Sequence, residues 1–411
     1  MLDLRAISRD PEPVRAALAR RNDGSDERLD AALELRARLN SLRPQLEQAQ
    51  AERNAGAKKI GEAKRAGEDA SEAIAAMQAV SARVKELEPE VARLEQELAE
   101  VQATLPNPPD PTAADEDSVV RSWGSPLESG RDHLELAGPM IDMEAGAKVA
   151  GSRFAYLKGD LVLVELALVR WAMEVLRGHG FEPVIPPVLV REQALFGTGF
   201  LPDTEQQIYS LASDPLYLSG TSEVALASLH AGEIMDEVPR HYAGFSPCFR
   251  REAGAAGKDT RGIFRVHQFD KVEMFSFVEP SASVDEHERL LSIEEELMQA
   301  LEIPYRVVNI GVAELGSSAA KKYDIEAWLP SQQRYRELTS TSNTTDFQSR
   351  RLDIRYRPDG GRPVHVHTLN GTAVAVGRTL IALMENHQGA DGVVSVPEVL
   401  VRWGAPGELR H

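Results

Sequence analysis

A repeating pattern of apolar residues over 26–105 restricts the folds open to this chain more than any other feature. The apolar residues recur at alternating steps of four and three, the spacing of helices that pack face to face. Gly61 and Gly67 separate two such seams, so we predict an antiparallel helical hairpin over about 26–104. The seams hold Leu35, Leu39, Leu42, Leu46 and Ala49, then Val80, Val84, Leu87, Val91, Leu94, Leu98, Val101 and Leu105.

Charge is unevenly distributed along this predicted arm. The returning helix is acidic, and in a structural coiled coil such charges simply face solvent. A cluster of cations can also neutralise the phosphates of a nucleic acid. The candidates for that role lie in the distal part of the arm and are Arg53, Lys58, Lys59, Lys64 and Arg65.

Two prolines fall inside the predicted arm helices. Pro44 and Pro89 lie at nearly equal sequence distances from Gly67, so an antiparallel hairpin should place them opposite one another. An interior proline removes a helical hydrogen bond and bends the helix. We therefore predict one bend that both helices share.

Composition narrows the class of protein. A chain of 411 residues with 42% hydrophobic content is long enough for two or three globular domains, and its net charge of −18 argues against indiscriminate binding of nucleic acids. The single cysteine, Cys248, excludes an intrachain disulfide framework and makes a zinc site improbable. No stretch reads as a secretion signal or a membrane span, so we expect a cytoplasmic protein without membrane contact.

The Pro-rich, acidic stretch 105–118 cannot continue a helix and should form a semi-rigid linker. The expected organisation is therefore an N-terminal domain over 1–104, a linker over 105–118 and a larger domain over 119–411. In the larger domain, 181–190 reads as a strand containing Pro187, which a sheet edge tolerates because proline lacks a backbone donor.

Two stretches of the larger domain carry candidate chemistry. Residues 249–277 read as a hairpin with charged residues and Phe269 on one face, although alternating charges are also ordinary on a solvated sheet face. Arginines there could bind phosphates, and an aromatic ring could stack on a base. Residues 371–388 place small residues and Arg378 ahead of an apolar helix, which suits the close approach of an anionic ligand.

Together these stretches resemble class II aminoacyl-tRNA synthetases. The family's motif 2 matches at Phe249, Arg250, Glu252, Arg265, Phe269 and Glu273, and motif 3 matches at Gly371, Gly377 and Arg378. Two multi-residue matches in the right order are a specific signal. The preceding arm and the Thr221–Glu223 element resemble the seryl-tRNA synthetases in particular. The resemblance implies an α+β fold, with a coiled-coil arm followed by a mainly antiparallel sheet flanked by helices.

The resemblance also implies site residues. Arg250, Arg378 and Glu337 would be catalytic, and Glu337 and Ser340 would hold Mg²⁺ with the phosphates of ATP. Alternation of side chains along a strand predicts that Thr221 and Glu223 share a strand face. Serine would contact Thr221, Ser222, Glu223, Arg250, Glu273, Asn343 and Thr372. ATP would contact Arg250, Arg251, Glu252, Val266, Phe269, Glu337, Leu338, Thr339, Ser340 and Arg378.

The activity implied is formation of seryl-adenylate from L-serine and ATP, then transfer of the seryl group to tRNA(Ser) and, in this family, tRNA(Sec). The cations of the arm would bind that tRNA, and a homodimer would hold it across subunits. Two alternatives stay open at this point. A paralogue could activate serine for an acceptor other than tRNA, or a non-catalytic paralogue could only bind RNA.

Overall fold

The computed structural model describes residues 1–202, 207–253, 259, 261–358 and 360–411. Contacts within the chain divide it into two compact units, which we call the arm unit (1–106) and the body unit (107–411). The loop of the predicted 249–277 hairpin lies partly outside the described residues, at 254–258 and 260.

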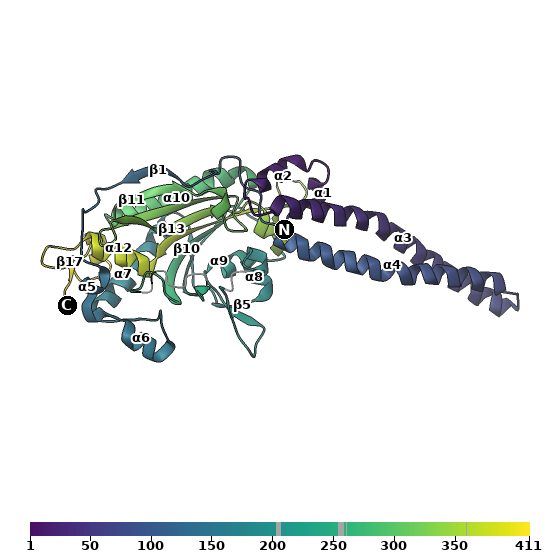
Figure 1. The fold of residues 1–411 in the computed structure, drawn as a ribbon, viewed down its shortest axis with the longest axis horizontal. Coiled ribbons are helices and arrows are strands. Elements are labelled where there is room, and N and C mark those ends of the chain that lie inside the picture. Colours follow the sequence, from purple (N-terminus) through teal and green to yellow (C-terminus); the bar gives the residue numbers. More distant parts are fainter. Residues whose placement is uncertain (203–206, 254–258, 260, 359) are drawn as a thin grey trace. The chain divides into compact units, whose positions relative to one another are not determined.

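The arm unit consists of two short helices followed by two long antiparallel ones (Figure 1). The long hairpin is confirmed. Gly67 ends α3 with a φ of +75°, a left-handed conformation that glycine adopts without strain. Gly61, expected to help form the turn, instead lies inside α3. The helices are α1 (Leu4–Ile7), α2 (Glu12–Ala19), α3 (Ser25–Ala66) and α4 (Ser71–Thr104).

Apolar side chains from both long helices form the seam between them. Leu39, Val91 and Leu94 are buried together, and Leu94 is fully inaccessible to solvent. Polar contacts flank the seam and cross from one helix to the other, including Gln50 Nε2 to Glu88 Oε1 at 2.8 Å. The heptad spacing thus gives a packed interface with a defined register.

The two prolines of the arm lie in facing stretches of α3 and α4. Both helices continue through them. The side chain of Arg43 pairs with Glu95, and that of Gln45 bonds Arg83, so the residues flanking Pro44 bracket the position of Pro89 on the partner helix. The shared bend remains a prediction.

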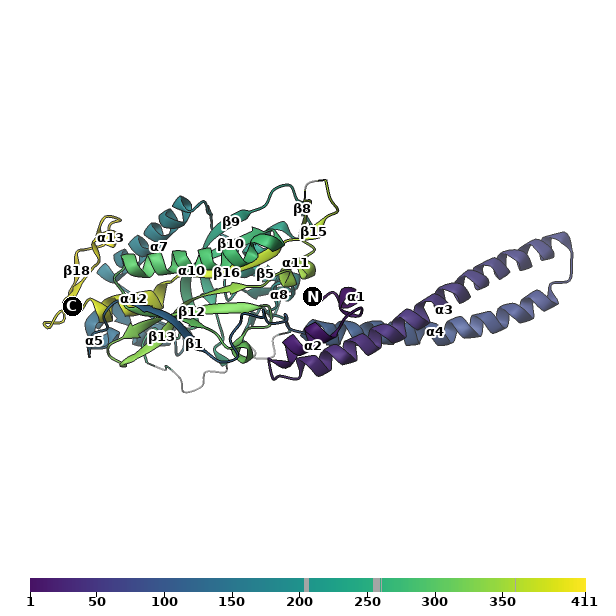
Figure 2. The ribbon, with the colours of Figure 1, turned by 90° about the horizontal axis from the view of Figure 1, so that it is seen from above.

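The body unit is built on an eight-stranded sheet in the order β1-β11-β12-β13-β16-β10-β9-β4. All neighbours pair antiparallel except β4 and β9, which run parallel. Figure 2 shows the sheet with long helices lying along it. The strands are β1 (Ser118–Trp123), β4 (Glu182–Val184), β9 (Arg240–Phe249), β10 (Gln268–Val278), β11 (Tyr305–Asn309), β12 (Lys321–Leu329), β13 (Arg334–Asn343) and β16 (His367–Ala375).

Helices supply much of the apolar core of the body unit. Those that matter for the site are α5 (His133–Ala137), α7 (Asp160–Gly178), α9 (Glu223–Ala227), α10 (Ser283–Ala300) and α12 (Val376–Asn386). The others are α6 (Met143–Ala150), α8 (Glu192–Thr198), α11 (Phe347–Leu352) and α13 (Glu398–Val401). Short strands complete the unit: β2 (Ile141–Asp142), β3 (Tyr156–Leu157), β5 (Leu189–Arg191), β6 (Tyr209–Ser210), β7 (Leu216–Leu218), β8 (Ile234–Met235), β14 (Arg355–Tyr356), β15 (Val364–His365), β17 (Val394–Ser395) and β18 (Glu408–Leu409).

Two local expectations need correction. The strand predicted over 181–190 is divided into β4 and β5, which belong to different sheets, and Pro187 lies between them.

The stretch predicted as a linker is also held more firmly than expected. Asn107 is buried, and its side-chain amide donates to the carbonyl oxygens of Ser318 and Thr344. A proline-rich composition did not reveal that anchor.

No helix among the described residues is both long enough and apolar enough to cross a membrane.

The seam of the arm can be tested with Leu94→Ala. Removing a fully buried leucine should lower the free energy of unfolding of the arm by about 2–5 kcal/mol, because the transfer energy is lost and a cavity remains. Helical circular dichroism during denaturant unfolding measures it. Ile74→Ala, at a position 37% exposed in the same helix, is the control and should cost under about 1 kcal/mol. Equal losses in both variants would contradict the packed seam.

Candidate active site

A cleft of about 710 Å³ opens in the body unit, lined by residues of β9, β10, β13, β16 and the start of α12. The antiparallel register brings these together, because β10 pairs with β9 on one side and β16 on the other. Predicted site residues that line it are Thr221, Glu223, Arg250, Glu252, Val266, Phe269, Glu273, Glu337, Leu338, Thr339, Ser340, Thr372 and Arg378.

A buried polar cluster forms one part of the cleft. Lys271 Nζ lies 2.5 Å from Glu273 Oε2 and donates to Thr221 Oγ1 at 2.7 Å. Thr372 Oγ1 donates to the same oxygen of Glu273 at 3.2 Å. These four side chains come from two paired strands and the turn before α9, and all are less than a tenth exposed. The cluster offers hydroxyl and carboxylate groups to a small polar ligand.

Glu223 lies beside this cluster, and among the described residues no lysine or arginine forms an ion pair with it. Its Oε1 accepts a hydrogen bond from Gln348 Nε2 at 2.8 Å. Burial, reinforced by the negative charge of Glu273, raises the pKa of Glu223 to about 7. A cationic ligand placed here would supply the missing counter-charge and favour the ionised carboxylate.

Arginines and an aromatic ring form the opposite part of the cleft. The guanidinium carbon of Arg250 lies 5.3 Å from the centre of the Phe269 ring, and Arg250 Nε donates to the carbonyl of Gly220 at 3.2 Å. Arg265 Nη1 donates to Glu252 Oε2 at 2.5 Å. Guanidinium groups held in this way keep donors free for phosphate oxygens.

Glu337 and Arg378 pair at the mouth of the cleft. Arg378 Nη1 lies 3.2 Å from Glu337 Oε2 and also donates to the Glu337 carbonyl at 3.0 Å. Burial opposes ionisation of Glu337, but the charges of Arg378 and Lys322 prevail and lower its pKa to about 2. Glu337 is therefore a carboxylate throughout the physiological pH range and is available as an oxygen ligand.

Three predicted ligand residues do not line the cleft. Side chains alternate along β13, so Ser342 faces the cleft while Asn343 is buried on the other side, where its amide donates to the Ser283 carbonyl of α10. Ser222 is buried, with its hydroxyl turned toward Gly244. Arg251 is exposed to solvent.

The expected strand face for Thr221 and Glu223 is wrong as well. Thr221 and Ser222 form a turn, and Glu223 is the first residue of α9. The Thr221 hydroxyl accepts the Glu223 backbone N–H at 3.2 Å. The two side chains reach the same cleft because the turn folds them together.

Comparison with known proteins identifies the family. A family model described as the tRNA synthetase class II core domain (G, H, P, S and T) matches residues 209–387, and one described as the seryl-tRNA synthetase N-terminal domain matches residues 1–109. The serine--tRNA ligase of Nocardia farcinica is 48% identical, over 100% of this chain and 99% of that protein. The chain belongs to the seryl-tRNA synthetases.

Other seryl-tRNA synthetases agree with this assignment. The serine--tRNA ligase of Streptomyces coelicolor is 49% identical over 97% of this chain and 96% of that protein. The crystal structure of seryl-tRNA synthetase from Pyrococcus horikoshii complexed with ATP superposes with a TM-score of 0.91, at 41% identity and 99% coverage of both chains. The predicted fold class, a helical arm followed by a mostly antiparallel sheet with helices, is confirmed.

Some cleft residues of this seryl-tRNA synthetase were given no role by sequence reasoning. Lys271 shares the strand face of Phe269 and Glu273, so alternation alone places it in the cleft, but its ion pair with Glu273 could not be foreseen. Lys322, Ser342 and Asn370 also line the cleft. They come from neighbouring strands, whose register no local motif reveals.

The donor atoms near Glu337 fit Mg²⁺. The Glu337 carboxylate and the Ser340 hydroxyl are hard oxygen ligands from one strand, and both line the cleft. Among the described residues, no group of three or more His, Cys, Asp or Glu could hold a metal ion. The two oxygen ligands of Glu337 and Ser340 suit Mg²⁺, which usually takes few protein ligands and completes its shell with water and substrate phosphates.

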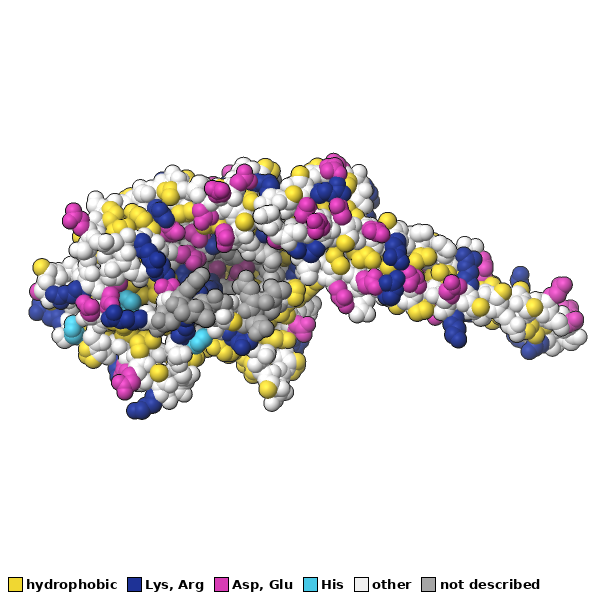
Figure 3. Space-filling model, in the orientation of Figure 1, with side chains coloured by type: hydrophobic (Ala, Val, Ile, Leu, Met, Phe, Trp, Pro, Cys, Tyr) yellow, Lys and Arg dark blue, Asp and Glu magenta, His cyan; other side chains and the backbone are white. Residues whose placement is uncertain are grey.

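The predicted tRNA-binding cations all lie on α3 near the turn of the arm. Lys58, Lys59, Lys64 and Arg65 are exposed, whereas Arg53 is half-buried. Figure 3 shows Lys and Arg side chains beside Asp and Glu side chains along the arm, its far end included. The arm thus presents both charges, and recognition of a phosphate backbone would depend on local cations.

Lys271→Met tests the buried ion pair. Removing the ammonium leaves Glu273 without its partner in a buried site, so the free energy of unfolding should fall by about 3–5 kcal/mol at pH 8. The loss should shrink at pH 6. With the cation gone, the pKa of Glu223, already raised to about 7, rises further in the folded state. A carboxyl group whose pKa is raised by folding destabilises most at high pH.

Denaturant unfolding at the two pH values measures this effect. Lys148→Met, which changes an exposed lysine on α6 in the same way, is the matched control and should stay within about 0.5 kcal/mol. A loss of equal size at pH 8 and pH 6 would show that electrostatics is not its cause.

Proposed function

We propose that the cleft of the body unit joins L-serine to ATP as seryl-adenylate and then passes the seryl group to the 3′ end of tRNA(Ser). Membership in the seryl-tRNA synthetases supports a serine--tRNA ligase over both alternatives, a paralogue with another acceptor and a non-catalytic RNA-binding protein. The observation that carries the proposal is that one cleft contains both the buried polar cluster and the arginines Arg250 and Arg378.

Serine fits the buried cluster. Its ammonium group would pair with Glu223, for which the described residues supply no cation in direct contact, and with the hydroxyl of Thr221. Its own hydroxyl would reach Glu273 and Thr372, which already share a hydrogen bond. Alanine has no hydroxyl and would form no hydrogen bond with these buried groups, and that loss is a basis for its rejection.

ATP fits the opposite part of the cleft. Adenine would stack on Phe269 near the backbone of Val266. Arg250, Arg265 and Arg378, which line the same cleft, would face the phosphates. In the first step a carboxylate oxygen of serine attacks the α-phosphorus and pyrophosphate leaves. Arg250 packs on the ring of Phe269 and would lie between the two substrates. Its guanidinium would hold both the serine carboxylate and the α-phosphate and offset the negative charge that accumulates on the phosphoryl oxygens.

Glu337 and Ser340 would hold Mg²⁺ on the phosphate side of the cleft. Bound there, the ion would neutralise phosphate charge and orient the pyrophosphate group as it leaves. Glu337 remains ionised for this purpose because Arg378 and Lys322 lower its pKa. In the second step a ribose hydroxyl of the tRNA attacks the carbonyl carbon of the adenylate, and AMP leaves.

The arm and the apolar surface of the body unit support further parts of the proposal. The arm cations would contact the backbone of tRNA(Ser) or, as the family resemblance implies, tRNA(Sec). A homodimer would bury apolar side chains next to the edge strand β4, where Ile185 is 82% exposed and Leu166 of the adjoining α7 is 60% exposed. Binding of tRNA across subunits and a cytoplasmic location also remain proposals.

Arg250→Ala tests the chemistry. Loss of a guanidinium that stabilises transition-state charge should slow serine-dependent exchange of pyrophosphate into ATP by about 10²-fold or more. Arg240→Ala removes an exposed arginine at the other end of β9 and should leave the exchange rate within about twofold. Near-normal exchange by a folded Arg250→Ala protein would refute the role assigned to Arg250.

Replacing residues 25–104 by a short loop tests the role of the arm. The two units have separate apolar cores, so the shortened protein should retain serine-dependent pyrophosphate exchange. Charging of tRNA(Ser) should fall at least tenfold, because the arm contacts to the tRNA are gone. If charging survives undiminished, the arm does not read the tRNA, and an acceptor other than tRNA becomes the better proposal.

A further inference from the structure

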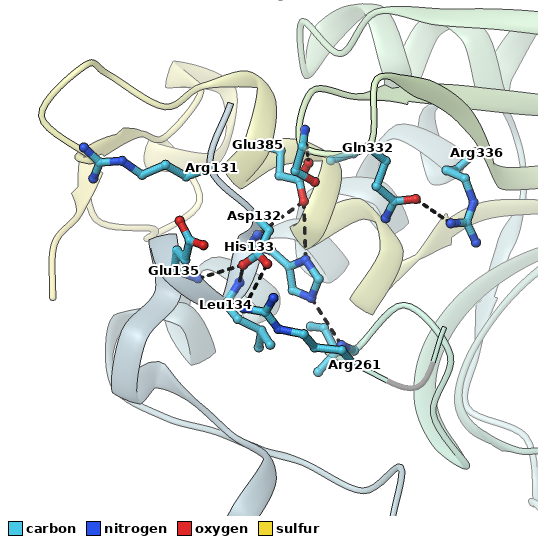
Figure 4. Close-up of polar contacts among 12 residues, drawn as sticks. Arg131, Asp132, His133, Leu134, Glu135, Arg261, Gln332, Arg336 and Glu385 are labelled. Atoms are coloured by element: carbon cyan, nitrogen blue, oxygen red, sulfur yellow. Dashed lines mark hydrogen bonds and ion pairs between the residues drawn. The ribbon is translucent and has the colours of Figure 1, made fainter. Parts of the chain in front are cut away.

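A buried histidine connects three segments outside the substrate contacts proposed above. His133 is the first residue of α5, and its side chain and backbone both face Glu385 of α12 (Figure 4). His133 Nδ1 lies 3.3 Å from Glu385 Oε1, and the His133 backbone N–H donates to the same oxygen at 3.2 Å. On the other edge of the ring, Nε2 accepts the backbone N–H of Ile263 at 3.3 Å.

These contacts define the tautomer of His133. Because Nε2 accepts a backbone N–H, it carries no proton, so the ring proton lies on Nδ1 and is donated to the Glu385 carboxylate. Glu385 is fully buried, and its second oxygen accepts the Ser331 backbone N–H at 3.2 Å. The carboxylate thus fixes the ring, and the ring fixes the amide of Ile263.

Gly262 allows the backbone before Ile263 to lie close to the His133 ring. Its φ is +79°, a conformation that other residues rarely adopt. A Cβ at this position would lie only 2.1 Å from His133 Nε2. The chain therefore has a glycine where the segment 262–264 must pass directly over the ring. An ion pair of Arg261 with Asp132, at 3.1 Å, lies beside the contact, but its arginine is largely exposed, so the pair contributes little.

The anchored segment leads directly to an arginine of the ATP site. Phe264 follows Ile263, and its ring contacts two guanidinium groups. The central carbon of Arg336 lies 3.9 Å from the ring centre and that of Arg378 lies 4.8 Å from it. Arg336 is itself held by Gln332 (Figure 4). The position of the Phe264 ring thus limits where the Arg378 guanidinium can lie.

We infer that His133 is a positioning residue for ATP. By fixing the amide of Ile263, it holds Phe264 against Arg378 and so keeps that guanidinium oriented toward the phosphates. His133 does not line the cleft and touches neither substrate, so its effect is indirect. The inference rests on the proposed function, because it assumes that Arg378 contacts ATP.

Two substitutions separate the ring's two contacts. In His133→Asn, the amide can replace Nδ1 as donor to Glu385 but cannot reach Ile263. In His133→Gln, the longer amide places an acceptor where Nε2 was. We expect His133→Asn to raise the KM for ATP roughly three- to tenfold, the effect of one lost buried hydrogen bond, with the KM for serine unchanged. His133→Gln should restore the KM for ATP to within about twofold of the unaltered enzyme.

Pyrophosphate exchange on the full chain gives both KM values. Glu135→Gln, at an exposed position of α5, is the control and should match the unaltered enzyme. The inference fails if His133→Asn leaves the KM for ATP unchanged, if His133→Gln raises it as much, or if the KM values for ATP and serine rise together. If the unaltered enzyme lacks serine-dependent exchange, the proposed function fails instead.

Hydrogen exchange on the unaltered enzyme tests the anchor without substitution or catalysis. The Ile263 amide should be protected by at least about tenfold relative to an exposed amide, with neither ATP nor serine present. Exchange as fast as that of an exposed amide would overturn the inference even if the variants failed to fold.

Discussion

The buried ion pair of Lys271 and Glu273 is the contact around which the cleft is arranged. Burying a charge is costly unless a partner compensates it, and here both charges lie two residues apart on one face of β10. The neighbouring elements supply the remaining hydrogen bonds, with Thr372 from β16 and Thr221 from the turn before α9. The register of three segments is therefore tied to one pair of side chains.

The two ends of the cleft keep carboxyl groups in opposite states. Glu223 is buried next to another acid, which raises its pKa to about 7, while Glu337 lies among cations that lower its pKa to about 2. An amine suits the first environment, because it supplies the absent positive charge. A metal ion with phosphates suits the second, because the carboxylate there is already ionised. One cleft thus provides two electrostatic environments for two substrates.

Periodicity and alternation made much of this molecule predictable. The steps of four and three over 26–105 give the arm, and alternation along β10 places Phe269 and Glu273 on the cleft side. Predictions failed where the position of a side chain depends on contacts between segments that are far apart in the sequence. Asn343 follows Ser342, and which of the two faces the cleft depends on the pairing of β13 with its neighbours. His133 was missed because its partners lie more than a hundred residues away, on separate segments.

The register of the arm has a consequence for how its length can vary. Contacts such as Gln50 with Glu88 tie each level of α3 to one level of α4, and the turn at Gly67 joins the two at the far end. An insertion in one helix alone would shift every seam residue beyond it out of contact. Inserted segments must therefore be equal in both helices, and multiples of about seven residues keep the seam on the same face without a change of winding. The arm can grow or shrink only in such paired steps.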